Sequence, residues 1–146
     1  MKLIVITDAQ RNIVEPIWLA RAEDVHRQLR PQLRTDYLAQ MQEIFAGGAE
    51  MAVVVVDDAV VGVAVFRLMV RSFTGRDIYC DDLVSDETKR STGIGHMLIA
   101  HMENIARQRG CSALSLDSGT QRQQAHKFYF REGMTVPSFH FSKSLQ

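Results

Sequence analysis

Two neighbouring carboxylates, Asp81 and Asp82, stand a few residues before a glycine-containing loop that runs from Arg90 to Gly95. Carboxylates can attract a cationic group or accept a proton from it. The loop, Arg-Ser-Thr-Gly-Ile-Gly, precedes an apolar-periodic run, so its glycines can let a phosphate approach the first backbone N–H groups of a helix. These residue types therefore suggest acid–base chemistry beside an anion site.

Three kinds of phosphate-binding loop compete for this glycine pair. A dinucleotide-binding fingerprint needs a third glycine where the chain has Leu98, and a Walker loop needs a Gly-Lys-Ser/Thr triplet that the sequence lacks. The remaining form is Arg-x-x-Gly-x-Gly at a strand-to-helix junction, where Lys89 and Arg90 add positive charge. An ordinary helix start with a flexible turn is the alternative that the loop alone leaves open.

Hydrophobic periodicity predicts the elements that position these residues. Strands are expected over residues 2–6, 51–56, 60–70, 76–84, 112–117 and 138–142. Helices are expected over residues 13–29, from a Thr35-Asp36 cap to Phe45, over 94–109 and over 121–131. The central strands are linked by tight turns and the later ones alternate with helices, which predicts a mixed α/β sheet with helices on both faces. One domain is expected over residues 1–146.

A second motif, Ala-x-x-Phe-Tyr-x-x-x-Gly-Met, covers residues 125–134 after one more strand. Ala125, Phe128 and Tyr129 share one helix face, which taken alone is more simply core than catalytic. Together with the loop and the element order, the motif resembles the GNAT superfamily of acetyl-CoA-dependent N-acetyltransferases. The resemblance implies an α/β fold (α+β by some schemes) with a mostly antiparallel sheet and a central, splayed pair of parallel strands.

The resemblance also implies a site for acetyl-CoA as co-substrate. The phosphates of coenzyme A would rest on Arg90, Ser91, Thr92, Gly93, Ile94 and Gly95. The pantetheine arm would pair with the backbone of Leu83, Val84 and Ser85. Arg122 stands where the family often has an asparagine and is expected to reach a phosphate instead. Tyr129 matches the position whose phenol protonates the leaving thiolate.

Asp82 and Asp81 are the carboxylates expected at the active site. An alkylammonium must lose a proton before it attacks a thioester, and a carboxylate beside the pantetheine segment can attract it or take that proton. The two side chains point to opposite faces of the strand unless a bulge intervenes. Two alternatives stay open: one acid is exposed or pairs with Arg76 or Lys89, or His26 of the N-terminal helices is the base.

Composition narrows the function classes further. Lys+Arg and Asp+Glu both number 17, so the net charge is zero and nucleic acid is not expected as a partner. No apolar run reaches the roughly 18 residues of a membrane span, and the first apolar run is too short for a secretory signal. The histidines and cysteines show no metal-binding spacing, and mid-strand Cys80 is most simply a small buried hydrophobe. We therefore expect no metal, no membrane and a reducing cytoplasm.

The sequence thus predicts an enzyme that moves the acetyl group of acetyl-CoA directly to a primary amine. The acceptor can be a small metabolite, a polyamine, an aminoglycoside-like drug or a protein amine, and a small molecule is favoured. The alternatives are a non-catalytic acyl-CoA-binding or sensing module and a nucleotide-binding regulatory domain. The resemblance also makes a homodimer a possible oligomeric state.

Overall fold

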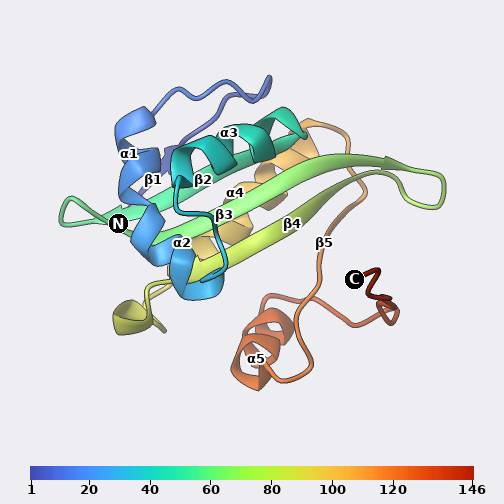
Figure 1. Cartoon of the computed structure of the whole chain (residues 1–146). Helices are drawn as coiled ribbons and strands as arrows, with labels where there is room; N and C mark the ends of the chain where they lie inside the picture. Colours follow the sequence, from blue (N-terminus) through green and yellow to red (C-terminus); the bar gives the residue numbers. More distant parts are fainter. The chain divides into compact units, whose positions relative to one another are not determined.

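A five-stranded sheet in the order β1-β2-β3-β4-β5 is the framework of the computed structural model, which describes all residues 1–146 (Figure 1). The strands are β1 (Lys2–Val5), β2 (Ala49–Val56), β3 (Ala59–Arg71), β4 (Gly75–Ser85) and β5 (Ala113–Leu116). Strands β1 to β4 pair antiparallel with their neighbours, whereas β4 and β5 are parallel. The predicted mixed, mostly antiparallel sheet with a parallel pair is confirmed, but β5 is the last strand of the order, so the pair lies at the edge of the sheet rather than at its centre.

The chain divides into two units, Met1–Ser115 and Leu116–Gln146. The helices of the first unit are α1 (Pro16–Arg21), α2 (Glu23–Leu29), α3 (Tyr37–Ala46), α4 (Ile94–Gln108) and the single 3-10 turn η1 (Glu87–Lys89). The second unit contains the end of β5 and α5 (Gln123–Arg131). None of these helices combines the length and the apolar character that crossing a membrane requires. A single domain over residues 1–146 stays a prediction.

The hairpin of β2 and β3 confirms the turn expected between the two β-branched runs. Asp57 and Asp58 both have positive φ, 48° and 61°, and the strands pair immediately outside them, Val56 with Ala59. Two consecutive residues of positive φ make the tight turn whose twist matches that of the flanking strands. This turn sets the pairing of β2 with β3 next to it, up to the register shift between Val54 and Val55.

The N-terminal helices differ from the single helix expected over residues 13–29. Helix α1 begins at Pro16, whose missing N–H costs nothing at a first helical position, and the helix ends at Ala22, where α2 takes over. Both short helices lie on the same face of the sheet, so the apolar spacing continues across the break and gives no sign of it (Figure 1). The expected cap of α3 is confirmed, because the Asp36 carboxylate accepts a hydrogen bond from the Ala39 N–H at 3.0 Å.

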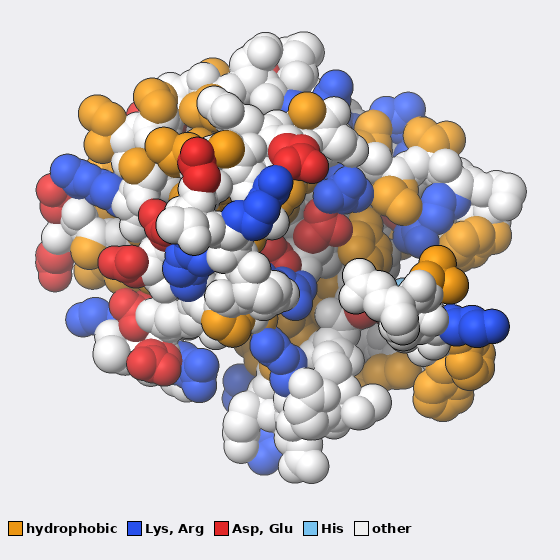
Figure 2. Space-filling view, in the orientation of Figure 1, with side chains coloured by type: hydrophobic (Ala, Val, Ile, Leu, Met, Phe, Trp, Pro, Cys, Tyr) orange, Lys and Arg blue, Asp and Glu red, His pale blue; other side chains and the backbone are white.

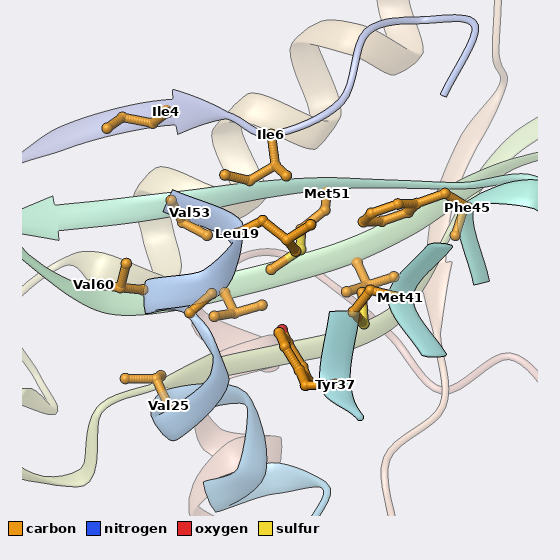
Figure 3. Packing of buried hydrophobic residues seen from close by; sticks show 14 of the residues in the cluster. Ile4, Ile6, Leu19, Val25, Tyr37, Met41, Phe45, Met51, Val53 and Val60 are labelled. Atoms are coloured by element: carbon orange, nitrogen blue, oxygen red, sulfur yellow. The ribbon is translucent and has the colours of Figure 1, made fainter. Parts of the chain in front are cut away.

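Helices α1 to α3 cover one face of the sheet and α4 covers the other (Figure 1). On the first face, Leu19, Met41 and Phe45 point toward Met51 and Val53 of β2, and all five are almost fully buried (Figure 3). Burial on both faces explains why β2 reads as a continuous apolar run rather than an alternating one.

Gly62 brings helix α4 close to the opposite face. A Cβ atom at this position would lie 2.3 Å from Ile94 Cγ2, which is too short for a real contact, and 3.2 Å from Leu98 Cδ1, which is tight. The missing side chain therefore lets the first turn of α4 pack directly on β3. This contact sets the place of the glycine loop that precedes α4.

The strand expected over residues 138–142 is absent, which corrects the prediction from alternation. Phe139 and Phe141 have exposed fractions of 85% and 90%, and no regular element follows α5. Alternation produces a strand only where a neighbouring strand supplies ladder hydrogen bonds and a core covers one face. The second unit offers this segment neither.

Candidate functional site

The glycine loop ends in a left-handed turn that no side chain caps. Gly93 is the N-cap of α4 with φ of 88°, a conformation that favours glycine, and Ser91 also has positive φ, 65°. Thr92 Oγ1 donates to the Lys89 carbonyl at 2.5 Å and thus folds the loop back on η1. Ser91 to Gly93, which lead into this 15-residue helix, are exposed, and the N–H groups and dipole at a helix start attract an anion.

Contacts to β3 and α2 hold the segment before this loop. The Asp86 N–H donates to the Val61 carbonyl at 2.8 Å, and the Glu87 N–H donates to Gln28 Oε1 at 3.0 Å. The Asp86 carboxylate caps η1 by accepting from the Thr88 N–H at 3.0 Å, and this hydrogen bond lowers the pKa of Asp86. The loop is therefore fixed at its base while Arg90 to Gly93 stay exposed.

Leu83, Val84 and Ser85 are the last three residues of β4, and β3 pairs with them on one side of the strand. On the other side of β4, the Ser112 N–H donates to the Arg76 carbonyl at 2.9 Å. In a parallel pair, equal steps along the two strands keep residues level with one another. Ser115 is three residues beyond Ser112 and therefore lies level with about Tyr79, four residues before Leu83. Within the first unit, β3 pairs with the segment expected to bind pantetheine on one side, and its other backbone edge is a candidate for pairing with an added strand.

A β-bulge at Asp81 turns both carboxylates to the same face. Val65 pairs with Asp82 and Phe66 with Cys80, so Asp81 is an extra residue of β4 with no partner in β3. Val65 belongs to the core under α1 to α3, and its cross-strand neighbour Asp82 shares that face. The bulge overrides the alternation that would have sent the two side chains to opposite faces.

Asp82 lies in a buried chain of hydrogen bonds. Its Oδ2 is 2.8 Å from His26 Nε2, and His26 Nδ1 is 2.8 Å from the Tyr37 hydroxyl. Arg30 Nε donates to the other oxygen, Oδ1, at 2.7 Å. His26 is fully buried, while the Asp82 side chain keeps an exposed fraction of 13%. A carboxylate in this setting is held in one orientation and still reaches solvent.

The charge states in this chain follow from burial and pairing. Burial would raise the pKa of Asp82, but the hydrogen bonds from His26 and Arg30 and their electrostatic attraction outweigh it and lower the pKa below its ordinary value. Burial, with the negative charges of Glu23 and Asp82, raises the pKa of Tyr37. Tyr37 therefore keeps its proton and can donate to His26 Nδ1, which leaves the Nε2 proton to bind Asp82.

Asp81 pairs with a different arginine. Arg67 donates to Asp81 Oδ2 from Nε at 2.8 Å and from Nη2 at 2.6 Å. Arg30 Nη2 donates to the Asp81 carbonyl at 3.0 Å and so satisfies the backbone of the bulge. Neither acid is paired with Arg76, whose Nε donates to the Arg109 carbonyl, or with Lys89. Both acids are instead compensated by arginines that the sequence pattern did not single out.

Cys80 is unsuited to act as a nucleophile. It is buried, its Sγ donates to the Asp82 carbonyl at 3.3 Å, and burial raises the pKa of its thiol far above the ordinary value. The thiolate is the reactive form of cysteine, so this thiol is inert at neutral pH. The interpretation of Cys80 as a small core residue agrees with this geometry.

Tyr129 and Arg122 lie in the second unit. Tyr129 is on α5 with its ring 5.4 Å from that of Phe128, and its carbonyl accepts from the Met134 N–H at 3.0 Å. Arg122 is the N-cap of α5 and is exposed. The roles expected of both residues stay predictions. Asp81, Asp82, the Leu83–Ser85 segment and the glycine loop all belong to the first unit.

Three residues of the site were not found from the sequence. Arg30, Arg67 and Tyr37 contact the acids or His26 across 11 to 52 positions of the chain, and no local motif marks such contacts. Pro31 was a usable signal, because a residue before proline is disfavoured in a helix. Arg30 accordingly closes α2 with φ of −124°.

A comparison with protein families matches residues 13–134 to the acetyltransferase (GNAT) family. Among curated proteins, an uncharacterized N-acetyltransferase, YhdJ of Bacillus subtilis, is 40% identical over 70 residues, which are 47% of this chain and 49% of that protein. The aminoalkylphosphonate N-acetyltransferase of Salmonella typhimurium is 39% identical over 64 residues, 44% of this chain and 42% of that protein. The chain thus spans about half the length of the curated relatives it matches.

Solved structures share the fold over almost the whole chain. An acetyltransferase of Trypanosoma brucei has a TM-score of 0.76 at 22% identity, with 99% of each chain covered. The aminoglycoside N-acetyltransferase AAC(6')-Iy in complex with CoA has a TM-score of 0.81 at 16% identity, covering 99% of this chain and 96% of that one. At these identities the likeness shows the fold alone.

Proposed function

Because the chain belongs to the acetyltransferase (GNAT) family, whose co-substrate is acetyl-CoA, we propose that it transfers the acetyl group directly to the primary amine of a small molecule. The observation that carries the proposal is a glycine loop without a side-chain cap, together with the end of β4, where Leu83–Ser85 pair with β3 on one side. The loop suits the phosphates of coenzyme A, and the Leu83–Ser85 edge suits the pantetheine arm. The two curated relatives, both named as N-acetyltransferases, support the same reaction.

The proposed reaction needs no covalent enzyme intermediate. The amine nitrogen forms a bond to the thioester carbon, and the carbon–sulfur bond then breaks to release coenzyme A as a thiolate. A backbone N–H of the Leu83–Ser85 edge suits the oxyanion of the tetrahedral intermediate. Tyr129 is the proposed donor of the proton that the thiolate takes. Inert Cys80 fits a direct transfer.

Asp82 is the proposed carboxylate that receives the acceptor. Its lowered pKa keeps it ionised at neutral pH, so it attracts the ammonium form of an amine. A strongly ionised carboxylate is a weak base, and the proton therefore passes through Asp82 or an adjacent water to solvent rather than remaining on it. The name of the Salmonella relative, which acts on aminoalkylphosphonates, favours a small acceptor over a protein.

An amine panel tests the proposal. The rate of CoA release from acetyl-CoA is measured with small primary amines and with a peptide N-terminus, and calorimetry measures acetyl-CoA binding in parallel. We expect binding together with amine-dependent release. Acetyl-CoA binding without CoA release for any amine would favour the non-catalytic acyl-CoA-binding module over the enzyme. Absence of acetyl-CoA binding would reject both the enzyme and the binding module.

A further inference from the structure

Each carboxylate at the candidate site already has an arginine as its counter-ion. Arg67 binds Asp81 through two nitrogens, and Arg30 binds Asp82 at 2.7 Å. The two arginines and the two carboxylates together carry a net charge of zero. In the left and central parts of the view in Figure 2, acidic side chains lie among basic ones. The site therefore does not have the uncompensated acidic character that holds a polycation.

An acceptor with two positive charges would gain little binding free energy beside Asp82 and Arg30. An ammonium that approaches Asp82 also approaches the guanidinium of Arg30, and the repulsion offsets much of the attraction. To use the full charge of the carboxylate, such an acceptor would have to displace the bond from Arg30 Nε to Asp82 Oδ1. This argues against acceptors that carry only positive charge.

An acceptor with both signs of charge matches the pair. Arg30 uses Nε for Asp82 and Nη2 for the Asp81 carbonyl, and Nη1 takes part in neither contact. Its side chain has an exposed fraction of 39%, against 13% for Asp82, so the guanidinium is the more accessible of the two groups. The planar fork of arginine suits the oxygens of a phosphonate, phosphate or carboxylate.

The backbone conformation at the end of α2 positions the Arg30 side chain beside Asp82. Pro31 ends α2, and Arg30 leaves the helix with φ of −124° and ψ of 72°. The side chain then reaches the bulge of β4, where it holds both the Asp81 carbonyl and the Asp82 carboxylate. A positive group is thus fixed directly beside the carboxylate proposed to receive the amine.

We propose that the acceptor is a zwitterion, a primary amine with an oxyanion a few bonds from its nitrogen, and that Arg30 selects it by binding the oxyanion. The inference rests on the proposed acetyl transfer and names the class of acceptor for that site. Asp82 holds the amine end of the molecule while Arg30 holds the acidic end. Phosphonate and carboxylate share the chemistry that Arg30 recognises, and the test below separates them.

The test uses four amines of matched length: 2-aminoethylphosphonate, 3-aminopropanoate, propylamine and 1,3-diaminopropane. The ratio kcat/KM is measured for each with the wild-type protein and with Arg30→Gln, Arg30→Lys and Arg34→Gln. Arg34 is the matched control, because it is an exposed arginine of the first unit whose partner is Glu43. The wild-type protein should prefer at least one anionic amine over propylamine by at least about tenfold, the effect of one charge-assisted hydrogen bond.

Arg30→Gln should abolish this preference, Arg30→Lys should keep part of it, and Arg34→Gln should keep all of it. The better of the two anionic amines identifies the oxyanion. Equal or better use of propylamine or 1,3-diaminopropane by the wild-type protein overturns the zwitterion while leaving acetyl transfer intact. A preference that survives in Arg30→Gln overturns the role of Arg30. If Arg30→Gln does not fold, the kcat/KM values of the wild-type protein and of Arg30→Lys for the four amines still test the zwitterion and the role of Arg30. Release of no CoA with any amine rejects the acetyl transfer itself.

Discussion

Replacement of Asp82 by asparagine removes the charge at the centre of the site and keeps its shape. The amide oxygen can still accept from Arg30, but the amide nitrogen then faces His26 Nε2, which is a donor in the wild-type arrangement. Either that hydrogen bond is lost or His26 changes tautomer. A hydrogen bond to a charged group contributes about 1.5–3 kcal/mol, and the half-exposed Arg30 places the expected loss of stability toward the lower end.

The loss should depend on pH in a defined direction. The pKa of Asp82 is lowered in the folded state from its ordinary value of 3.8. Its stabilising contribution is therefore fully present above pH 3.8 and is lost as the pH falls through the lower, folded pKa. The difference in stability between wild type and Asp82→Asn should be largest near neutral pH and should shrink below pH 3.8.

Guanidinium denaturation of both proteins between pH 7 and pH 3 measures this difference. Asp58→Asn is the control, because Asp58 pairs with Arg21 at an exposed turn and asparagine tolerates its positive φ. The control should change stability by less than about 0.5 kcal/mol. A loss for Asp82→Asn that is as small as the control, or that does not change with pH, would refute the account of the buried chain.

Three further substitutions test the site. Gly95→Val should raise the acetyl-CoA dissociation constant at least about tenfold. Thermal stability should change little, because valine in a helix costs no more than glycine. Unchanged affinity by calorimetry would reject the assignment of residues 90–95 as a phosphate-binding loop. Gly62→Leu should destabilise the protein by about 1–3 kcal/mol, since its Cβ would meet Ile94, and should weaken acetyl-CoA binding; wild-type stability and affinity would show that α4 needs no close approach. Tyr129→Phe should lower kcat about a hundredfold at constant cofactor affinity; wild-type turnover would mean that water protonates the thiolate.

Most of the fold follows from local patterns in the sequence. The hairpin at Asp57-Asp58 and the cap at Asp36 depend on neighbouring residues and were predicted correctly. The break at Ala22 was not predicted, because the apolar spacing continues through two helices on one sheet face. The strand at 138–142 was wrong, because a strand also needs a partner that a periodic pattern does not supply.

The site could be predicted only in part for a related reason. Asp81, Asp82 and the glycine loop lie in one stretch of sequence, so their residue types and order were enough to predict them as site residues. The counter-ions of the acids come from residues 30 and 67, which only tertiary structure brings to the bulge. Those arginines are the basis for proposing a zwitterion rather than a cation as the acceptor, so the proposed specificity depends on contacts that the sequence pattern did not show.

Identification of the acetylated product tests the central claim most directly. The protein is incubated with isotopically labelled acetyl-CoA and 2-aminoethylphosphonate or 3-aminopropanoate, and mass spectrometry quantifies the labelled N-acetyl product, free CoA and the intact protein. We predict equal amounts of product and CoA, no CoA release without the amine, and no gain in protein mass. CoA released without an N-acetyl product, or label attached to the protein during turnover, would contradict direct transfer to an amine.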